Sequence, residues 1–257
     1  MSFKFIILGC GSSLGVPRID GYFGQCDPNN KKNYRSRCSG IFVSKKMNIL
    51  FDASPDLKNQ LLRNKIKNIN KVFFSHSHAD QTHGINELRY FYIKNKKKIP
   101  IFANKETKKY LFNSFNYCFK KTSEYPPILK MTSLKKIHNF YDGSKKLEIR
   151  SINVKHGKIE SAAYILNKKC AYLSDANKIY EKDIKYFKNL KYLIVDCLRE
   201  KFHPSHFNLK DVINLKKILN PYKTILTNMH SDLDYKSLRK KLPKSIYPAF
   251  DGMTLDL

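Results

Sequence analysis

The segment Val72–Glu87 reads VFFSHSHADQTHGINE and carries a metal-ligand pattern. An apolar run typical of a buried strand leads directly into His76, His78 and Asp80. Two imidazoles and a carboxylate at the point where a strand frays into a loop can converge on one ion, and this ligand set suits zinc or a similar first-row metal. A polar turn would explain the histidine pair alone. The added Asp80, Gly84 and upstream strand favour a metal site.

Length and composition are those of a globular protein. The 257 residues can form one large α/β domain over residues 1–257, and 42% of them are hydrophobic, enough to supply a core. No apolar run approaches the roughly 20 residues that span a bilayer. The N-terminal apolar run is also too short for a signal peptide. We therefore expect a cytoplasmic protein with no membrane partner.

The cysteines follow no CxxC spacing, and most lie in apolar segments. They are Cys10, Cys26, Cys38, Cys118, Cys170 and Cys197. Reduced, buried thiols explain this distribution better than a disulfide framework does. Cys26 and Cys38 flank a polar loop and could share a metal, but two thiolates do not complete a tetrahedral site.

The formal net charge is +28. Such an excess suggests a polyanionic partner, so binding to nucleic acid is possible. Compositional drift is the alternative, because lysine, asparagine and isoleucine abound, tryptophan is absent, and the basic residues spread through every segment. We favour drift over dedicated nucleic-acid binding. Either origin of the charge would attract a small phosphorylated substrate.

Apolar runs and capping signals predict a mixed α/β chain without linkers or repeats. Ten strands are expected, at residues 3–8, 41–43, 48–51, 71–75, 99–102, 147–154, 162–166, 170–173, 191–195 and 224–226. Helices are expected at residues 54–65, 104–119, 177–187, 208–219 and 234–241. Hairpin-like pairs open the first half, and the second half repeats the plan. This order favours two mixed sheets packed together with helices outside.

Polar residues follow several of the expected strands. The strand ends carry His156, then Ser174 and Asp175, then Asp196 with His203 and His206 beyond it, and finally Asn228 and His230. A single histidine after a strand is usually a solvated loop residue. Four such ends, added to the HSHAD segment, predict a shared site.

Taken in order, these motifs resemble the metallo-β-lactamase superfamily. They are the loop Gly9–Pro17 (GCGSSLGVP), the HSHAD segment, a downstream histidine, Ser-Asp-Ala at 174–176 and a final histidine. The opening loop and the ending Tyr247–Met253 are most similar to the branch that contains the phosphoribosyl 1,2-cyclic phosphate phosphodiesterases, beside the tRNA 3′-end-processing endonucleases. The resemblance covers nearly the whole chain. It implies an α/β (α+β) fold, a four-layer αβ/βα sandwich with a metal site along one edge.

The resemblance also implies ligand roles. His76, His78 and His156 would hold a first ion, Asp175 would bridge to a second, and Asp80 would bind the second. The implied cofactor is Zn²⁺, with two ions expected and Mn²⁺ as an alternative. Such ions activate a water molecule for attack on phosphorus, so Asp80 also counts as a catalytic residue.

The chain departs from the family pattern at the second ion. Gln81 stands where relatives have histidine, and Asn228 stands where many have histidine after threonine. His83 and His230 each lie two residues beyond the expected place. One interpretation is a displaced second site that uses His83 and His230, and we favour two ions on this basis. The other is a site that holds its second ion weakly.

His206, in the sequence HPSHFN, is the candidate general acid. In related phosphodiesterases a histidine in a comparable context protonates the leaving oxygen, a role that suits imidazole. The alternative is that His203 or His206 only caps this loop.

Three functions follow from these observations. The leading one is a metal-dependent phosphodiesterase that cleaves a small phosphodiester or cyclic phosphate, with a homodimer as one arrangement of the chain. The second is a tRNA 3′-end-processing endonuclease, which needs a protruding arm. Only residues 104–133 could supply one, and the part YLFNSFNYCFKK reads as a packed amphipathic helix, not a flexible arm rich in glycine and proline. The third is a metal-binding module in which Gln81 and Asn228 mark lost catalysis. The fold alone does not imply β-lactam hydrolysis.

Overall fold

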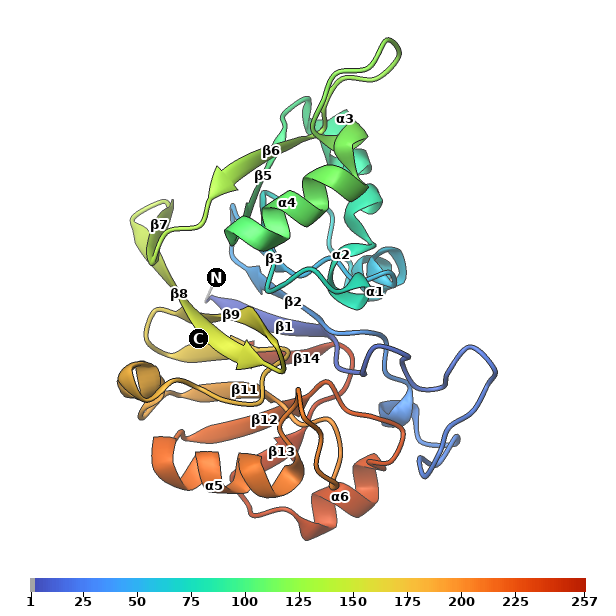
Figure 1. Cartoon of the computed structure of the whole chain (residues 1–257), viewed down its shortest axis with the longest axis vertical. Coiled ribbons are helices and arrows are strands. Elements are labelled where there is room, and N and C mark those ends of the chain that lie inside the picture. Colours follow the sequence, from blue (N-terminus) through green and yellow to red (C-terminus); the bar gives the residue numbers. More distant parts are fainter. Residues whose placement is uncertain (1–2) are drawn as a thin grey trace.

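Two seven-stranded sheets lie face to face at the centre of the molecule, with helices over their outer surfaces (Figure 1). The structure, a computed structural model, describes residues 3–257, so positions 1 and 2 of the expected 1–257 domain lie outside the described residues. The layering is the αβ/βα sandwich that the sequence predicts, and the fold-class prediction is confirmed.

Each sheet is half antiparallel and half parallel. The first has the order β14 (Met253–Asp256), β1 (Lys4–Gly9), β2 (Ser39–Val43), β3 (Asn48–Phe51), β4 (Lys71–Phe73), β5 (Ile99–Ala103), β6 (Leu129–Ser133). Strands from β14 to β3 pair antiparallel, and those from β3 to β6 pair parallel.

The second sheet has the order β13 (Ile246–Pro248), β12 (Lys223–Thr227), β11 (Tyr192–Asp196), β10 (Cys170–Leu173), β9 (Ile159–Leu166), β8 (Lys145–His156), β7 (Ile137–Asp142). Strands from β7 to β10 pair antiparallel and those from β10 to β13 pair parallel. The expected repetition of one plan in the two halves is confirmed.

Strand alternation divides the first sheet between two cores. Phe5 and Phe51 belong to the core between the sheets, where Phe5 meets Tyr172 of the second sheet at 5.4 Å between ring centroids. Leu8 and Leu50, whose side chains leave the same strands on the opposite face, belong to the core under the helices. Both sets are buried because a sheet covered on both faces must be apolar on both.

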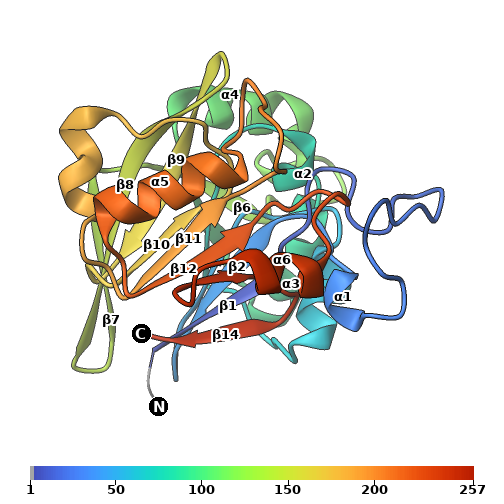
Figure 2. The same cartoon turned by 90° about the horizontal axis from the view of Figure 1, so that it is seen from below.

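Helices cover the outer faces. They are α1 (Leu57–Arg63), α2 (Ala79–Thr82), α3 (Arg89–Asn95), α4 (Lys105–Ser114), α5 (Leu209–Leu219) and α6 (Tyr235–Lys241), with short 3₁₀ helices η1 (Lys31–Asn33), η2 (Ile85–Leu88), η3 (Asn116–Cys118) and η4 (Glu181–Phe187). Figure 2 shows α5 lying across the outer face of the second sheet. The capping box of Asn208 and Asp211 begins this helix.

Several element predictions were wrong. The segment expected as a helix at 177–187 forms only the 3₁₀ helix η4, and α2, α3, β6, β7, β13 and β14 were not predicted. Most of these elements are short, and β7, for example, alternates exposed and buried residues without a continuous apolar run. Their backbone geometry depends on tertiary pairing more than on local preference.

The segment after α4 also differs from expectation. The helix ends at Ser114 instead of Phe119, because Phe115 leaves the helical region of backbone conformation (φ −132°, ψ 39°). The chain that follows η3 projects from the body at the top of Figure 1, before β6 begins. The 3₁₀ helix η3 therefore takes the place of the end of the expected helix, and an exposed turn follows it.

All six cysteines are buried free thiols, as predicted. Cys26 Sγ contacts the carbonyl oxygens of Ser231 and Leu233, whereas Cys38 Sγ lies 3.4 Å from Thr227 Oγ1, so these two thiols serve separate contacts. Over residues 3–257, no helix has both the length and the apolar character to cross a bilayer.

Candidate metal centre

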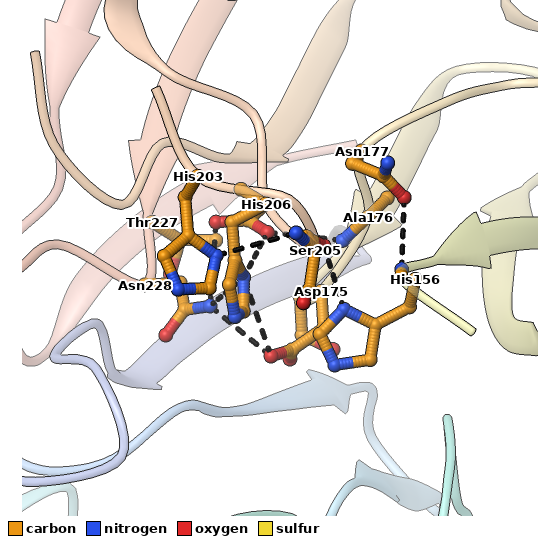
Figure 3. Close-up of polar contacts among 12 residues, drawn as sticks. His156, Asp175, Ala176, Asn177, His203, Ser205, His206, Thr227 and Asn228 are labelled. Atoms are coloured by element: carbon orange, nitrogen blue, oxygen red, sulfur yellow. Dashed lines mark hydrogen bonds and ion pairs between the residues drawn. The ribbon is translucent and has the colours of Figure 1, made fainter. Parts of the chain in front are cut away.

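One edge of the sandwich collects the polar residues that the sequence analysis singled out at strand ends. His76 and His78 follow β4, His156 ends β8, Asp175 follows β10, Asp196 ends β11 and Asn228 follows β12. Figure 3 shows Asp175 between His156 on one side and His206 with Asn228 on the other. Residues that are up to about 150 positions apart in the sequence therefore meet at one site.

Three imidazole nitrogens converge within this edge. His76 Nε2 lies 2.9 Å from His78 Nδ1, and His156 Nε2 lies 3.3 Å from the same His78 atom. The three ligand atoms all lie within 4.8 Å of one another. This compact group brings together the three histidines predicted to hold the first ion.

The outer contacts of two rings fix which nitrogen faces the group. His156 Nδ1 lies 2.7 Å from the Ser205 carbonyl oxygen, so Nδ1 carries the proton and Nε2 presents a lone pair. His76 Nδ1 lies 3.0 Å from Ser75 Oγ, so the Nε2 atom of His76 can also present a lone pair to the group. Lone pairs directed at one point repel each other unless a cation or a proton lies between them. The donor set therefore fits a divalent cation, with orienting partners of the usual kind.

Burial keeps these rings neutral. Desolvation lowers the pKa of His76 well below its ordinary value and also lowers the pKa of His78. Desolvation, with the charges of neighbouring histidines, lowers the pKa of His156 to about 4 despite its bond to Ser205. Neutral imidazole is the form that binds metal, so the group is ready to do so at neutral pH.

Asp52 supports this group and was missed by the sequence reasoning. It follows β3 with a left-handed backbone (φ 60°), and its Oδ1 accepts the Ser75 amide at 2.7 Å. Ser75 in turn contacts the His76 ring. Burial raises the pKa of Asp52 to about 7. A carboxylic acid directly after an apolar strand was the available signal.

Asp175 lies beside the histidine group and is surrounded by carboxamides. Gln81 Nε2 lies 3.1 Å from Asp175 Oδ2 and 3.2 Å from Asp80 Oδ2. Asn228 Nδ2 lies 3.1 Å from Asp175 Oδ1 and 3.3 Å from Asp196 Oδ1. Burial first, and then the Asp80 and Asp196 carboxylates, raise the pKa of Asp175 well above its ordinary value.

His206 forms a close pair with Asp196, the second acid whose role the sequence did not reveal. His206 Nδ1 lies 2.6 Å from Asp196 Oδ2 and 3.9 Å from Asp175 Oδ1. Burial alone would lower the pKa of His206, but the Asp196 carboxylate outweighs it, and the pKa rises to about 9. The ring is therefore an imidazolium at neutral pH, which holds a proton ready for donation.

Backbone contacts hold the His206 loop in place. Phe207 donates its amide to the Ala176 carbonyl at 2.7 Å, and Asn177 Nδ2 donates to the Pro204 carbonyl at 3.0 Å. His203 Nδ1 accepts the Ser205 amide at 3.3 Å. The loop-capping role that was weighed for His203 or His206 therefore belongs to His203 in this geometry.

A cleft of about 430 Å³ opens over these groups. His78, Asp80, His156, Asp175 and His206 line it, together with Ser12, Leu14 and Arg199 at other points of its wall.

Asp251, near the C-terminal end of the sequence, holds the glycine-rich loop Gly9–Pro17 in the wall of the cleft. Asp251 accepts the Cys10 and Ser36 amides at 3.1 and 2.8 Å, which fixes the exit of β1. Gly11 is required there because a Cβ would lie 2.6 Å from the Arg35 carbonyl oxygen. The opening and closing motifs thus form one structural unit beside the cleft.

The remaining predicted ligands lie apart from both histidine-containing clusters. His83 Nε2 lies 3.0 Å from Tyr110 Oη, on the helical side of the first sheet. His230 lines the cleft, but its Nδ1 lies 3.1 Å from Asp232 Oδ1. The structure gathers two clusters within the described part of the chain, one of His76, His78 and His156 and one of His156, Asp175 and His206. The geometry gives no support to the displaced second site.

Comparisons with known proteins agree with this fold. Residues 47–229 match the family described as the β-lactamase superfamily domain. The chain is 27% identical over 255 residues to an octanoyltransferase of Porphyromonas gingivalis (strain ATCC BAA-308 / W83), an alignment that covers 97% of this chain and 51% of that protein. The chain thus spans about half the length of the curated relative it matches.

Solved structures extend the likeness over nearly the whole chain. A diphosphatase from the PhnP family superposes with a TM-score of 0.87 and 27% identity, covering 99% of this chain and 98% of the other. The short form of human tRNase Z has a TM-score of 0.71 at 15% identity, with 98% of each chain covered, and shares the fold. The chain therefore belongs to the β-lactamase superfamily domain family, and it has the fold of the metal-dependent metallo-β-lactamase hydrolases.

Proposed function

We propose that this protein is a metal-dependent phosphodiesterase that cleaves a small phosphodiester or cyclic phosphate. The observation that carries the proposal is the convergence of the His76, His78 and His156 nitrogens in the same cleft as the His206–Asp196 pair. The first group suits a Lewis-acidic ion and the second suits a proton donor. Each group would speed hydrolysis of an ester with a poor leaving group.

The residues of the cleft wall support an anionic substrate. Arg199 lines the cleft, where its guanidinium can pair with a phosphoryl oxygen. The net charge of +28 favours the approach of anions. Similarity to a protein described as a diphosphatase also supports a phosphorus-centred reaction. A volume of about 430 Å³ suits a small molecule.

Three histidines would hold the cation, namely His76, His78 and His156. A bound divalent cation polarises a phosphoryl oxygen and lowers the pKa of a nearby water molecule. We infer Zn²⁺ from the imidazole donor set, with Mn²⁺ as the alternative.

The chain's own groups handle the protons. Asp80 and Asp175 line the cleft, and their carboxylate oxygens can accept a proton from the attacking water as its oxygen bonds to phosphorus. The bond from phosphorus to the leaving oxygen breaks at the same centre. His206 donates its proton to that oxygen, and Asp196 stabilises the imidazolium until it does. General acid catalysis of this kind contributes about 10²–10⁴-fold.

Turnover of three substrates by Zn²⁺- or Mn²⁺-loaded protein tests the proposal. We expect hydrolysis of bis-p-nitrophenyl phosphate, slower hydrolysis of p-nitrophenyl phosphate, and no processing of precursor tRNA. The third substrate tests the endonuclease alternative. That activity needs a protruding arm, and the segment after α4 does project from the body. If the protein binds metal but hydrolyses none of the three substrates, the result would favour a metal-binding module that has lost catalysis.

A further inference from the structure

The carboxamides of Gln81 and Asn228 occupy positions where a second ion would need ligand atoms. Both side chains are buried, with exposures of 0% and 1%. They come from different sheets, one after β4 and one after β12, and they meet at Asp175. Gln81 Nε2 faces Asp175 Oδ2 and Asn228 Nδ2 faces Asp175 Oδ1. Each oxygen of this carboxylate thus receives one N–H donor.

The orientation of Gln81 is set by charge. Its Nε2 lies within 3.2 Å of two carboxylates, those of Asp80 and Asp175. The opposite orientation would place Oε1 against both carboxylates, which is repulsive. In the observed orientation Oε1 is buried and has no hydrogen-bond partner among residues 3–257. A buried amide oxygen without a hydrogen-bond partner is unfavourable. The attraction between the Nε2 group and the two carboxyl groups outweighs the loss of a partner for Oε1.

Nearby carboxylates also set the orientation of the Asn228 side-chain amide. Its Nδ2 reaches Oδ1 of both Asp175 and Asp196, and its backbone is left-handed (φ 58°), a conformation that asparagine tolerates better than most residues. Turning the amide would again bring its oxygen against two carboxylates. Two independent amides therefore present N–H groups, not lone pairs, to the acids of the site.

We propose that this protein binds a single divalent cation, at His76, His78 and His156, and that the amides of Gln81 and Asn228 replace the second cation. A cation requires lone pairs, so N–H donors at these positions oppose it. In place of an ion, the amides hold the side chains of Asp80 and Asp175 by hydrogen bonds at the cleft. This proposal takes the place of the expectation of two ions. It rests on the metal site of the proposed function, but it concerns only the number of ions.

Metal stoichiometry tests the proposal without reference to activity. Zn²⁺ titration of metal-free protein by calorimetry, with native mass spectrometry, should give one tight equivalent. The Gln81→His/Asn228→His variant should take up two. Asn189→His is the matched control, because Asn189 is also a left-handed asparagine (φ 56°) but lies on the surface, and it should bind one. Two equivalents in wild type with similar affinity would overturn the proposal and leave the proposed function standing. No tight equivalent would defeat both.

A second measurement covers the case in which the double variant fails to fold. Electron paramagnetic resonance of the wild-type protein with two equivalents of Mn²⁺ should show only the spectrum of isolated ions. An exchange-coupled spectrum would mean two adjacent ions and would overturn the proposal. The isosteric Gln81→Glu variant adds a third carboxylate at this point. Its melting temperature should fall in chelator and rise with Zn²⁺ by more than that of wild type, whereas an equal rise would count against the proposal.

Discussion

His206 Nδ1 lies 2.6 Å from Asp196 Oδ2, although ten residues separate them in the chain. The contact forms because the chain leaves β11 at Asp196, turns through the 200–207 loop and returns to the same edge. Asp196 is fully buried, so its carboxylate depends on this partner and on the amides of Ala176 and Asn228. The pair fixes the imidazole at the cleft in its charged form.

Replacing His206 should separate substrates by leaving group. We expect His206→Ala to slow hydrolysis of esters with alkoxide leaving groups by about 10²–10⁴-fold more than hydrolysis of p-nitrophenyl esters, which leave readily as anions. Metal content should match that of wild type, as measured by atomic emission. His83→Ala is the matched control, because His83 contacts Tyr110 away from the cleft, and it should be nearly normal. Equal losses on both substrate types would assign His206 to phosphate binding instead.

The pH profile should depend on Asp196. The pKa of His206 is raised to about 9, so the proton donor is present at neutral pH and is lost as pH rises through about 9. Its contribution to stability has the same sign and is lost as pH rises through about 9. In Asp196→Asn the pKa should fall toward its ordinary value, and the alkaline limb of kcat/KM for alkoxide esters should move to lower pH. An unmoved limb would assign that ionisation to another group.

Metal should be retained into mildly acidic solution. The pKa of His156 is lowered to about 4, and those of His76 and His78 are lowered as well, so protons compete poorly for these nitrogens. Bound Zn²⁺, followed by dialysis and elemental analysis, should therefore persist well below pH 6.5. His76→Ala and His78→Ala should each lose metal at neutral pH. Wild-type stoichiometry in both variants would contradict the ligand assignment.

Asp52 should stabilise the fold through its hydrogen bond to Ser75. Asp52→Ala leaves the buried Ser75 amide without its acceptor and should reduce the free energy of unfolding by about 1–3 kcal/mol. Asp52→Asn keeps an acceptor oxygen and avoids burying a charge, so it should be milder. Denaturant unfolding of the two variants measures the difference. A similar loss in both would show that the carboxylate charge, not the acceptor, matters.

The sequence determined most of the strands and the identity of the chemical groups. Apolar runs such as 48–51 and 170–173 coincide with β3 and β10, because a strand covered on both faces must be apolar throughout. The sequence also predicted that the HSHAD segment and the polar residues after later strands share one site. Parallel strands bring their carboxyl ends to one side, so residues that follow them meet.

Tertiary structure decided what those groups face. The pairing of His206 with Asp196 and the support of Ser75 by Asp52 need loops and sheets brought together over long separations. Gln81 and Asn228 looked from sequence like lost ligands, with His83 and His230 as substitutes. In the structure His83 turns to Tyr110, and the two amides turn their N–H groups to Asp175. Hydrogen-bond direction depends on the partners that surround a side chain in space, and residue type and spacing do not contain that information.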